Sequence, residues 1–236
     1  MMVLIATGNR GKLREIRQML APLGFDALGL ADVAVAGEPV EDGATFEDNA
    51  RLKAEYYGKQ AGLPVIADDS GLCVEALGGR PGVHSARYAG FDAPAQECAG
   101  TARCAPASGA NVTDAANNAK LLREMAGVAD RRARFVCVAV CRRPDGAELV
   151  ARGECEGVLL DAPRGTDGFG YDPLFFVPSL NATFAELPPA LKNQISHRGR
   201  ALQKLGEALA EFLSTSNSAR RVRKAKSMRN DEDSPK

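Results

Sequence analysis

Two adjacent carboxylates, Asp68 and Asp69, are the residues of this 236-residue chain that most directly suggest chemistry. Neighbouring carboxylates repel each other unless a cation or hydrogen bonds compensate. With Glu41 upstream, they supply the oxygen ligands that Mg²⁺ prefers, and a remaining carboxylate could deprotonate an attacking water. From the residues alone, the alternative is an Asx-type turn that closes a strand, with Ser70 and Gly71 as its turn residues.

A second candidate site is the loop of residues 7–12. It reads Thr7, Gly8, Asn9, Arg10, Gly11 and Lys12. Backbone N–H groups at the start of a following helix would favour an anion such as a phosphate. The loop is not a Walker P-loop, because only two residues separate its glycines and Leu13 follows the lysine. A tight strand-to-helix turn without a ligand is the alternative.

Three other segments offer ligand-binding side chains, each with an ordinary structural alternative. Lys53 follows Asn49 by one helical turn, and it could grip an anion or simply point into solvent. The glycine-rich segment 165–172 could bring its backbone and an aromatic ring against a flat ligand, or form a β-turn. His197 and Arg198 could donate to a carbonyl oxygen on a base, or mark the start of the last helix.

The elements that must position these residues alternate between strands and helices. Residues 2–6 and 64–67 predict short buried strands, the second ending abruptly at the acidic pair. Helices are predicted along the stripe Leu13, Ile16, Leu20 and over residues 46–61, 113–125 and 202–213, and further strands over residues 134–141, 147–152, 155–160 and 173–177. This order predicts the α/β class, with several strands following one another directly.

Composition places the chain among folded globular proteins. Hydrophobic residues make up 45% and charged residues 25% of the chain, which excludes wholesale disorder. The length suits one large or two small domains. The 30 basic and 30 acidic residues cancel, which excludes the overall basic excess expected of a protein that binds nucleic acid by neutralising phosphates.

Two segments stand apart from this average. Residues 92–111 are rich in Ala, Gly, Pro and Ser without periodicity and predict a mobile loop. Residues 214–236 carry seven Lys or Arg against three Asp or Glu and lack an apolar face. They predict a basic, disordered tail that follows one domain over residues 1–213.

The chain is expected to be cytoplasmic. Its longest apolar run, residues 135–141, is too short to span a bilayer, and its N-terminus lacks the basic lead-in and apolar core of a signal peptide. Its six cysteines form no C-x-x-C pair, which favours reduced thiols over a metal or redox site.

The motifs follow one another in a recognisable order. They are Thr7-Gly8-Asn9-x-x-Lys12, Glu41-x-Gly43-x-Thr45-Phe46-x-x-Asn49-Ala50-x-x-Lys53-Ala54, Ala67-Asp68-Asp69-Ser70-Gly71-Leu72, Gly78-Gly79-x-Pro81-Gly82, Ser85-Ala86-Arg87-Tyr88, Gly168-Phe169-Gly170-Tyr171-Asp172-Pro173 and Ser196-His197-Arg198. In this order they resemble the inosine triphosphate pyrophosphatase family, the house-cleaning XTP/dITP diphosphatases that hydrolyse non-standard purine nucleoside triphosphates.

The resemblance implies an enzyme, a nucleoside triphosphate pyrophosphatase that converts ITP, dITP or XTP to the monophosphate and pyrophosphate. It implies an elongated α/β fold with a long central mixed sheet flanked by helices. It also implies two lobes with the active-site cleft between them, and a homodimer.

The resemblance assigns roles residue by residue. Glu41 and Asp69 would bind Mg²⁺, and Asp69 would also accept the proton of the hydrolytic water. Asp68 is a third candidate ligand because it adjoins Asp69. The expected substrate-binding residues are Thr7, Gly8, Asn9, Arg10, Gly11, Lys12, Lys53, Ser70, Phe169, Gly170, Tyr171, Asp172, Lys192, His197 and Arg198. Donors such as His197 and Arg198 would bind the oxygen that hypoxanthine and xanthine carry where adenine has an amino group.

Two other classes of function stay open beside this one. The first is a catalytically inactive, nucleotide-binding regulatory module, which the presence of all three carboxylates disfavours. The second is nucleic-acid binding through the tail, which would be weak and salt-sensitive and has no aromatic residues for base stacking. The loop over residues 92–111 and the tail depart from the family pattern without interrupting a motif.

Overall fold

In this computed structural model the backbone is described for residues 1–92 and 113–230, and the side chains for residues 1–90 and 113–215. Nearly all of the predicted loop over residues 92–111 therefore lies outside the described residues, as do residues 231–236 of the predicted tail. No helix in the described part of the chain is long and apolar enough to cross a membrane.

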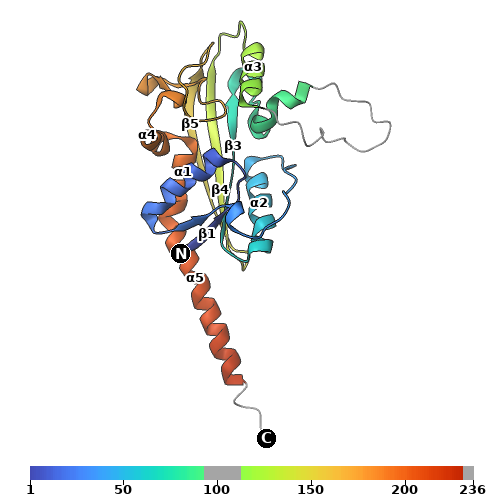
Figure 1. Ribbon diagram of the computed structural model, residues 1–236, viewed down its shortest axis with the longest axis vertical. Coiled ribbons are helices and arrows are strands. Elements are labelled where there is room, and N and C mark those ends of the chain that lie inside the picture. Colours follow the sequence, from blue (N-terminus) through green and yellow to red (C-terminus); the bar gives the residue numbers. More distant parts are fainter. Residues whose placement is uncertain (93–112, 231–236) are drawn as a thin grey trace, which may run out of the picture.

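A seven-stranded mixed sheet with the order β2-β1-β3-β4-β5-β6-β7 forms the centre of an elongated molecule (Figure 1). The strands are β1 (Met2–Ile5), β2 (Asp26–Leu28), β3 (Val65–Val74), β4 (Arg132–Arg142), β5 (Glu148–Leu159), β6 (Phe175–Val177) and β7 (Ala182–Thr183). β1 pairs in parallel with β2 and β3, and every later pair is antiparallel. The predicted α/β class with a mixed central sheet is confirmed.

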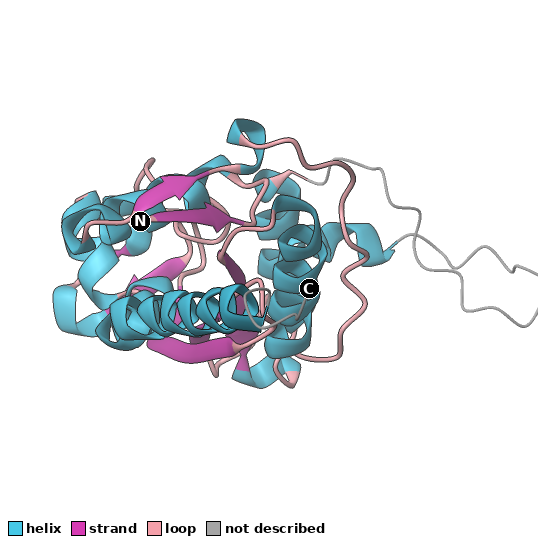
Figure 2. Cartoon of the chain, turned by 90° about the horizontal axis from the view of Figure 1, so that it is seen from below, coloured by secondary structure: helices cyan, strands magenta, loops and turns pink. Residues whose placement is uncertain are grey.

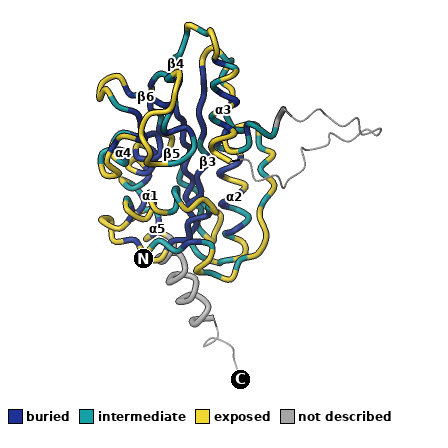
Figure 3. The backbone as a smooth tube through the Cα atoms, turned by 45° about the horizontal axis from the view of Figure 1, so that its top comes forward, coloured by how far each residue is buried: buried dark blue, intermediate teal, exposed yellow. Residues whose placement is uncertain are grey.

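Helices lie on both sides of the strands, as the view from below shows (Figure 2). The α-helices are α1 (Arg10–Leu20), α2 (Phe46–Ala61), α3 (Asp114–Glu124), α4 (Pro189–Ile195) and α5 (His197–Asn230). Short 3-10 helices are η1 (Ala21–Leu23), η2 (Leu30–Asp32), η3 (Glu75–Leu77), η4 (Gly82–Asp92), η5 (Pro178–Leu180) and η6 (Phe184–Glu186). The strands between these layers form the buried core (Figure 3).

The alternation of side chains along β3 separates two apolar clusters. Ile66 packs in the cluster formed with α1 and α5, whereas Val65 and Ala67 pack in the cluster formed with α2. Successive residues of a strand point to opposite faces. Asp68 and Asp69, the next two residues, therefore face α1 with α5 and α2, respectively.

Local signals explain where the helices begin. Thr45 caps α2, because its side chain accepts a hydrogen bond from the Asp48 N–H and the Asp48 carboxylate accepts one from the Thr45 N–H. Asn9 caps α1 in a related way. The predicted helix over residues 46–61 is confirmed at both ends, and Thr113 caps α3 at its predicted start.

Two strand predictions were wrong in their boundaries. β3 does not end before the acidic pair but continues through it to Val74, paired with β4 along its whole length. The strands predicted over residues 147–152 and 155–160 are one strand, β5. Its Gly153 allows the start of α5 to approach, because a Cβ there would lie 2.2 Å from the His197 carbonyl oxygen.

The last helix is longer than the sequence predicts. Its apolar stripe ends at Leu213, as expected, yet the described backbone continues as α5 to Asn230 where a disordered tail is predicted from residue 214. Continuing an existing helix avoids the unfavourable nucleation step. The residues after Leu213 therefore need no buried face of their own to extend it.

Candidate active site

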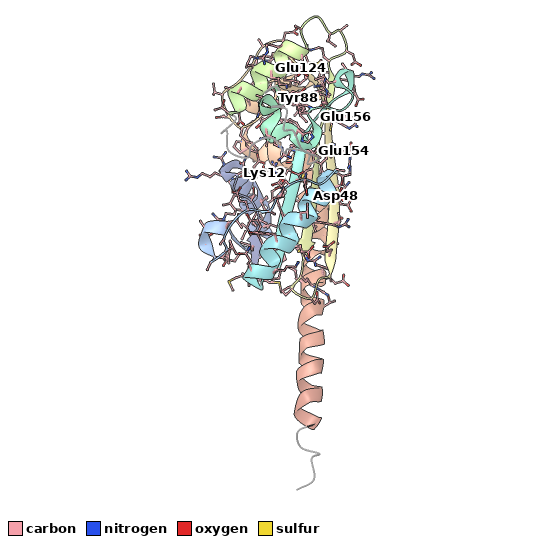
Figure 4. All side chains as sticks on the ribbon, turned by 90° about the vertical axis from the view of Figure 1, so that its right-hand side faces the viewer. Lys12, Asp48, Tyr88, Glu124, Glu154 and Glu156 are labelled. Atoms are coloured by element: carbon pink, nitrogen blue, oxygen red, sulfur yellow. The ribbon has the colours of Figure 1, made fainter. Side chains whose placement is uncertain are left out.

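One pocket collects side chains from distant parts of the chain. Among the predicted site residues its walls contain Thr7, Gly8, Asn9, Lys12, Glu41, Lys53, Asp69, Ser70, Phe169, Gly170, Tyr171, Asp172, Lys192, His197 and Arg198. Arg10, Gly11 and Asp68 are predicted site residues outside these walls. The starts of α1 and α2 lie beside the middle of the sheet, where Figure 4 labels Lys12 and Asp48.

Asp68 is buried beneath the pocket and is neutralised by two cations. Its Oδ2 lies 3.0 Å from Lys12 Nζ and 3.3 Å from Arg198 Nε. Burial alone would raise the pKa of Asp68, but Lys12 and Arg198 hold it far below its usual value. Asp68 is therefore an anion that fixes two cationic side chains, and it lies on the opposite face of β3 from Asp69.

Asp69 and Glu41 share a different cation. Lys53 Nζ lies 3.4 Å from Asp69 Oδ1 and 3.5 Å from Glu41 Oε2. Burial would lower the pKa of Lys53, but the two carboxylates raise it, so Lys53 stays charged. The solvated-lysine alternative is excluded, because the Lys53 side chain is only 9% exposed.

The loop before α1 has fewer backbone N–H groups available to bind a phosphate than the sequence predicts. Asn9 Oδ1 accepts hydrogen bonds from the N–H groups of Gly11 and Lys12, at 2.8 and 3.0 Å. These two donors are therefore satisfied within the protein. Gly11 instead packs against Phe169, whose ring would lie 2.6 Å from a Cβ at this position, and Arg10 is exposed.

Two cationic side chains, those of Lys192 and Arg198, lie over the Phe169 ring. Lys192 Nζ lies 4.8 Å from its centroid and the Arg198 guanidinium carbon lies 5.5 Å from it. Asp172 Oδ2 accepts the Phe169 N–H at 2.9 Å and binds Lys192 Nζ at 2.6 Å. Asp172 thus holds the loop and the lysine together, and burial raises its pKa despite Lys192.

Helix α3 fixes the next residue of this loop. The N–H of Gly170 donates to Asp114 Oδ2 at 2.6 Å, and its carbonyl oxygen accepts from Asn118 Nδ2 at 3.0 Å. Both polar groups of one glycine are therefore held by α3. Tyr171 is anchored separately, through its hydroxyl, to the Ser85 carbonyl oxygen at 2.9 Å.

Glu15 of α1 joins the two cations that border Phe169. Its carboxylate oxygens lie 2.9 Å from Lys192 Nζ and 2.5 Å from Arg198 Nη1. Burial would raise the pKa of Glu15, but Arg198 and Lys192 lower it. The result is a buried chain of alternating charges that also includes Asp68.

His197 is the first residue of α5 and is enclosed by aromatic rings. Its ring stacks on Phe135 with centroids 4.6 Å apart, and it is 4% exposed. Burial, together with Arg198 and Lys192, holds the pKa of His197 well below its usual value, so the imidazole is neutral. Its Nδ1 is buried without a hydrogen-bond partner in the described structure.

Comparison with known proteins identifies the architecture. The pattern of the Ham1 family matches residues 3–208. The chain belongs to the Ham1 family. A relative from Thermus thermophilus named dITP/XTP pyrophosphatase is 50% identical over 210 residues, covering 88% of this chain and 91% of the relative. One of the same name from Geobacter sulfurreducens is 49% identical over 209 residues, with 88% and 96% covered.

A solved structure agrees with this assignment. The chain resembles a HAM1 protein from Coxiella burnetii with a TM-score of 0.74 and 40% identity, covering 89% of this chain and 99% of that one. The resemblance inferred from the motifs is confirmed by the family match and by these relatives.

Several residues of this Ham1 site escape sequence reasoning. Glu15, Arg87, Asp114 and Asn118 contact predicted site residues without having been predicted themselves. A carboxylate next to Ile16, beside the apolar stripe of α1, is a usable signal for Glu15. Arg87 belongs to the motif Ser85-Ala86-Arg87-Tyr88, although no role was predicted for it. The sequence offers no comparable signal for Asp114 and Asn118, because their partner Gly170 lies 56 and 52 residues away.

Proposed function

We propose that the protein hydrolyses non-standard purine nucleoside triphosphates, namely ITP, dITP and XTP, to the monophosphate and pyrophosphate. The names of its Ham1 relatives support this activity. The observation that carries the proposal is the composition of the pocket. Its lining includes Lys12, Lys53, Glu41 and Asp69 together with Phe169, His197 and Arg198.

In the proposed complex, the triphosphate lies against Lys12 in the first turn of α1 and Lys53 in the middle of α2. Lys12 and Lys53 are both held by carboxylates, so their ammonium groups are already oriented before a substrate binds. Preorganised cations stabilise the charge that develops on a transferred or departing phosphate. Thr7 and Gly8 also line the pocket.

Mg²⁺ is the metal we propose, with Glu41 and Asp69 as its ligands. Mg²⁺ usually takes one or two protein carboxylates and completes its shell with waters and substrate phosphates. The two carboxylates around Lys53 Nζ fit this donor set. When bound, the ion would neutralise phosphate charge and acidify a water. We assign Asp68 to holding Lys12 and Arg198, since it lies on the other face of β3.

Asp69 is the proposed proton acceptor for the hydrolytic water. Its carboxylate borders the pocket and is held by Asn49 and Lys53 at 3.1 and 3.4 Å, so it keeps a fixed orientation. General bases of this kind contribute about 10²–10⁴-fold to a rate. No covalent nucleophile is needed for attack of water on a phosphoanhydride.

The base would bind where Phe169, His197 and Arg198 meet. Hypoxanthine and xanthine place an oxygen at position 6, which suits the donors of Arg198 and a neutral imidazole. Adenine places an amino group there, so a donor would face donors and find no acceptor. Mismatches of this kind give about 10⁴–10⁵-fold rejection.

We propose a homodimer that acts in the cytoplasm, where the described cysteines, all unpaired, would stay reduced. An inactive regulatory module is disfavoured, because it would have no need for Glu41 and Asp69 to share a cation at the pocket wall.

A substrate panel tests the proposal. Pyrophosphate release should be measured from ITP, dITP, XTP, GTP and ATP, each with Mg²⁺ and each with excess chelator. We expect kcat/KM for ITP and XTP to exceed that for ATP by at least about 10²-fold, and activity to disappear with the chelator. Equal rates for ITP and ATP would refute the proposed base recognition.

A further inference from the structure

Asn49 connects the two parts of the chain that carry the proposed metal ligands. It is 0% exposed and is the fourth residue of α2. Both the nitrogen and the oxygen of its side-chain amide form hydrogen bonds. Nδ2 donates to Asp69 Oδ2 at 3.1 Å, and Oδ1 accepts the Gly43 N–H at 2.8 Å. One buried side chain therefore links strand β3 to the loop that carries Glu41.

That loop, residues 33–45, contains no helix or strand and depends on such contacts for its position. At Gly43 it packs directly on the amide, because a Cβ there would lie 2.6 Å from Asn49 Oδ1. Arg87 Nη2 donates to the Glu41 carbonyl oxygen at 3.0 Å. The backbone around Glu41 is thus held from two sides.

The backbone of Asn49 is also fixed, so its side-chain amide cannot move far. The Asn49 N–H donates to the Thr45 carbonyl oxygen at 3.2 Å, and the capping box of Thr45 and Asp48 fixes this first turn. One turn later, Lys53 bridges Glu41 and Asp69. The start of α2 therefore sets where both carboxylates lie.

We infer that Asn49 is a positioning residue that sets the separation of the Glu41 and Asp69 carboxylates and thereby the affinity of the site for a divalent cation. This inference rests on the proposed function, because it takes these two residues as the metal ligands. Groups that hold metal ligands in place typically change metal affinity or activity about 10–100-fold when they are removed.

Two variants and one control separate positioning from ordinary stability. Asn49→Ala removes both hydrogen bonds. Gly43→Ala pushes the loop away from the same amide while leaving the buried side chain intact, so the fold should survive. Gln60→Ala is the matched control on α2, since the Gln60 amide also holds this loop with two hydrogen bonds, to the N–H and carbonyl of Ala36.

The test is Mn²⁺ binding to the full chain without nucleotide, followed by the paramagnetic resonance signal of the free ion, with thermal unfolding measured alongside. We expect Asn49→Ala and Gly43→Ala to raise the Mn²⁺ dissociation constant about 10–100-fold. Gln60→Ala should stay within twofold of wild type. The Mg²⁺ concentration for half-maximal ITP hydrolysis should rise in the same two variants.

The outcomes distinguish the inference from the proposed function. If both variants bind Mn²⁺ as tightly as the wild type but have a lowered Tm, Asn49 contributes only to stability and the inference is wrong. The proposed hydrolysis of ITP is unaffected by that result. Absence of Mn²⁺ binding in the wild-type protein would overturn both the inference and the assignment of the metal ligands. Failure of the wild-type protein to hydrolyse ITP would instead refute the proposed function.

Discussion

At the scale of single residues, the two adjacent aspartates have separate roles because a strand turns them to opposite faces. Asp68 is buried with Lys12 and Arg198, whereas Asp69 borders the pocket with Lys53. Their mutual repulsion is relieved by different cations, and this lets a continuous strand carry both. Of these two aspartates, only Asp69 lines the pocket.

Replacing Asp69 by asparagine should abolish most turnover while preserving the fold. Asp69→Asn keeps the size of the side chain but removes the base and one ligand charge, so kcat for ITP should fall about 10²–10⁴-fold. The measurement is steady-state kinetics at saturating Mg²⁺, with Tm to check folding. Asp161→Asn, at a carboxylate 94% exposed, serves as the control. A kcat near wild type in Asp69→Asn would remove the role.

His197 should make the protein less stable as the pH falls through the range where free histidine titrates. In the unfolded chain a histidine takes up a proton near pH ~6.5, whereas the folded-state pKa of His197 is well below that. Below about pH 6.5 the unfolded state therefore binds more protons than the folded state, and the free energy of unfolding decreases as the pH falls.

The two histidines of the chain allow this effect to be isolated. Tm should be recorded from pH 7.5 to 5.5 for the wild type, His197→Asn and His84→Asn. We expect His197→Asn to flatten most of the decrease, and His84→Asn, whose pKa is less strongly lowered, to flatten little of it. An unchanged slope in His197→Asn would show that His197 is not the group responsible.

At the scale of elements, prediction from the sequence succeeded where the signal is local. The capping box at Thr45 and Asp48 lies within four residues, and it placed the start of α2 correctly. Prediction failed where contacts with residues distant in the sequence determine the boundary of an element. β3 continues through Asp68 and Asp69 because Lys12, Lys53 and Arg198 neutralise them, and no pattern near residue 68 reports those partners.

The candidate site shows the same division. Its predicted residues came from motifs read as units, and most of them line one pocket. The separation of Asp68 from Asp69 follows from strand pairing, which single-sequence reasoning did not extend past Ala67. Glu15 was missed because its partners Lys192 and Arg198 are nearly the whole chain away.

Helix α3 should influence substrate affinity through the loop that it holds. Asp114→Ala and Asn118→Ala each remove one hydrogen bond to Gly170, next to the Phe169 ring. Since a hydrogen bond contributes about 0.5–1.5 kcal/mol, KM for ITP should rise roughly two- to tenfold in each variant, with kcat nearly unchanged.

A control and an opposite outcome define this test. Asn193→Ala removes an exposed amide contact to Gln18 on another helix and should leave KM unchanged. A large decrease in kcat with an unchanged KM would mean that the α3 contacts serve the chemical step rather than placement of the base.

At the scale of the whole molecule, one sheet brings together motifs from both ends of the chain. α5 packs beside α1 against the sheet, so Arg198 and Lys12 of the loop of residues 7–12 share the carboxylate of Asp68. Beyond Leu213 the helix leaves the body of the protein (Figure 1). Its last described contact with the body is from Thr215, which accepts a hydrogen bond from Arg143 at 2.5 Å.

Deleting residues 216–236 should therefore leave catalysis and stability nearly unchanged. The deletion spares the apolar stripe and the Thr215 contact. Kinetics with ITP and a thermal unfolding curve measure the effect, and any weak, salt-sensitive binding of nucleic acid should fall with the deletion. Loss of dimerisation or turnover would show that the C-terminal extension is an integral part of the enzyme.

Which phosphoanhydride bond the protein cleaves decides whether it is a pyrophosphatase. The products formed from ITP with Mg²⁺ should be resolved by phosphorus NMR during a single time course. We expect inosine monophosphate and pyrophosphate in equal amounts from the start of the reaction. Inosine diphosphate and orthophosphate as the first products would contradict it, because the protein would then cleave the terminal phosphate rather than the bond between the α- and β-phosphates.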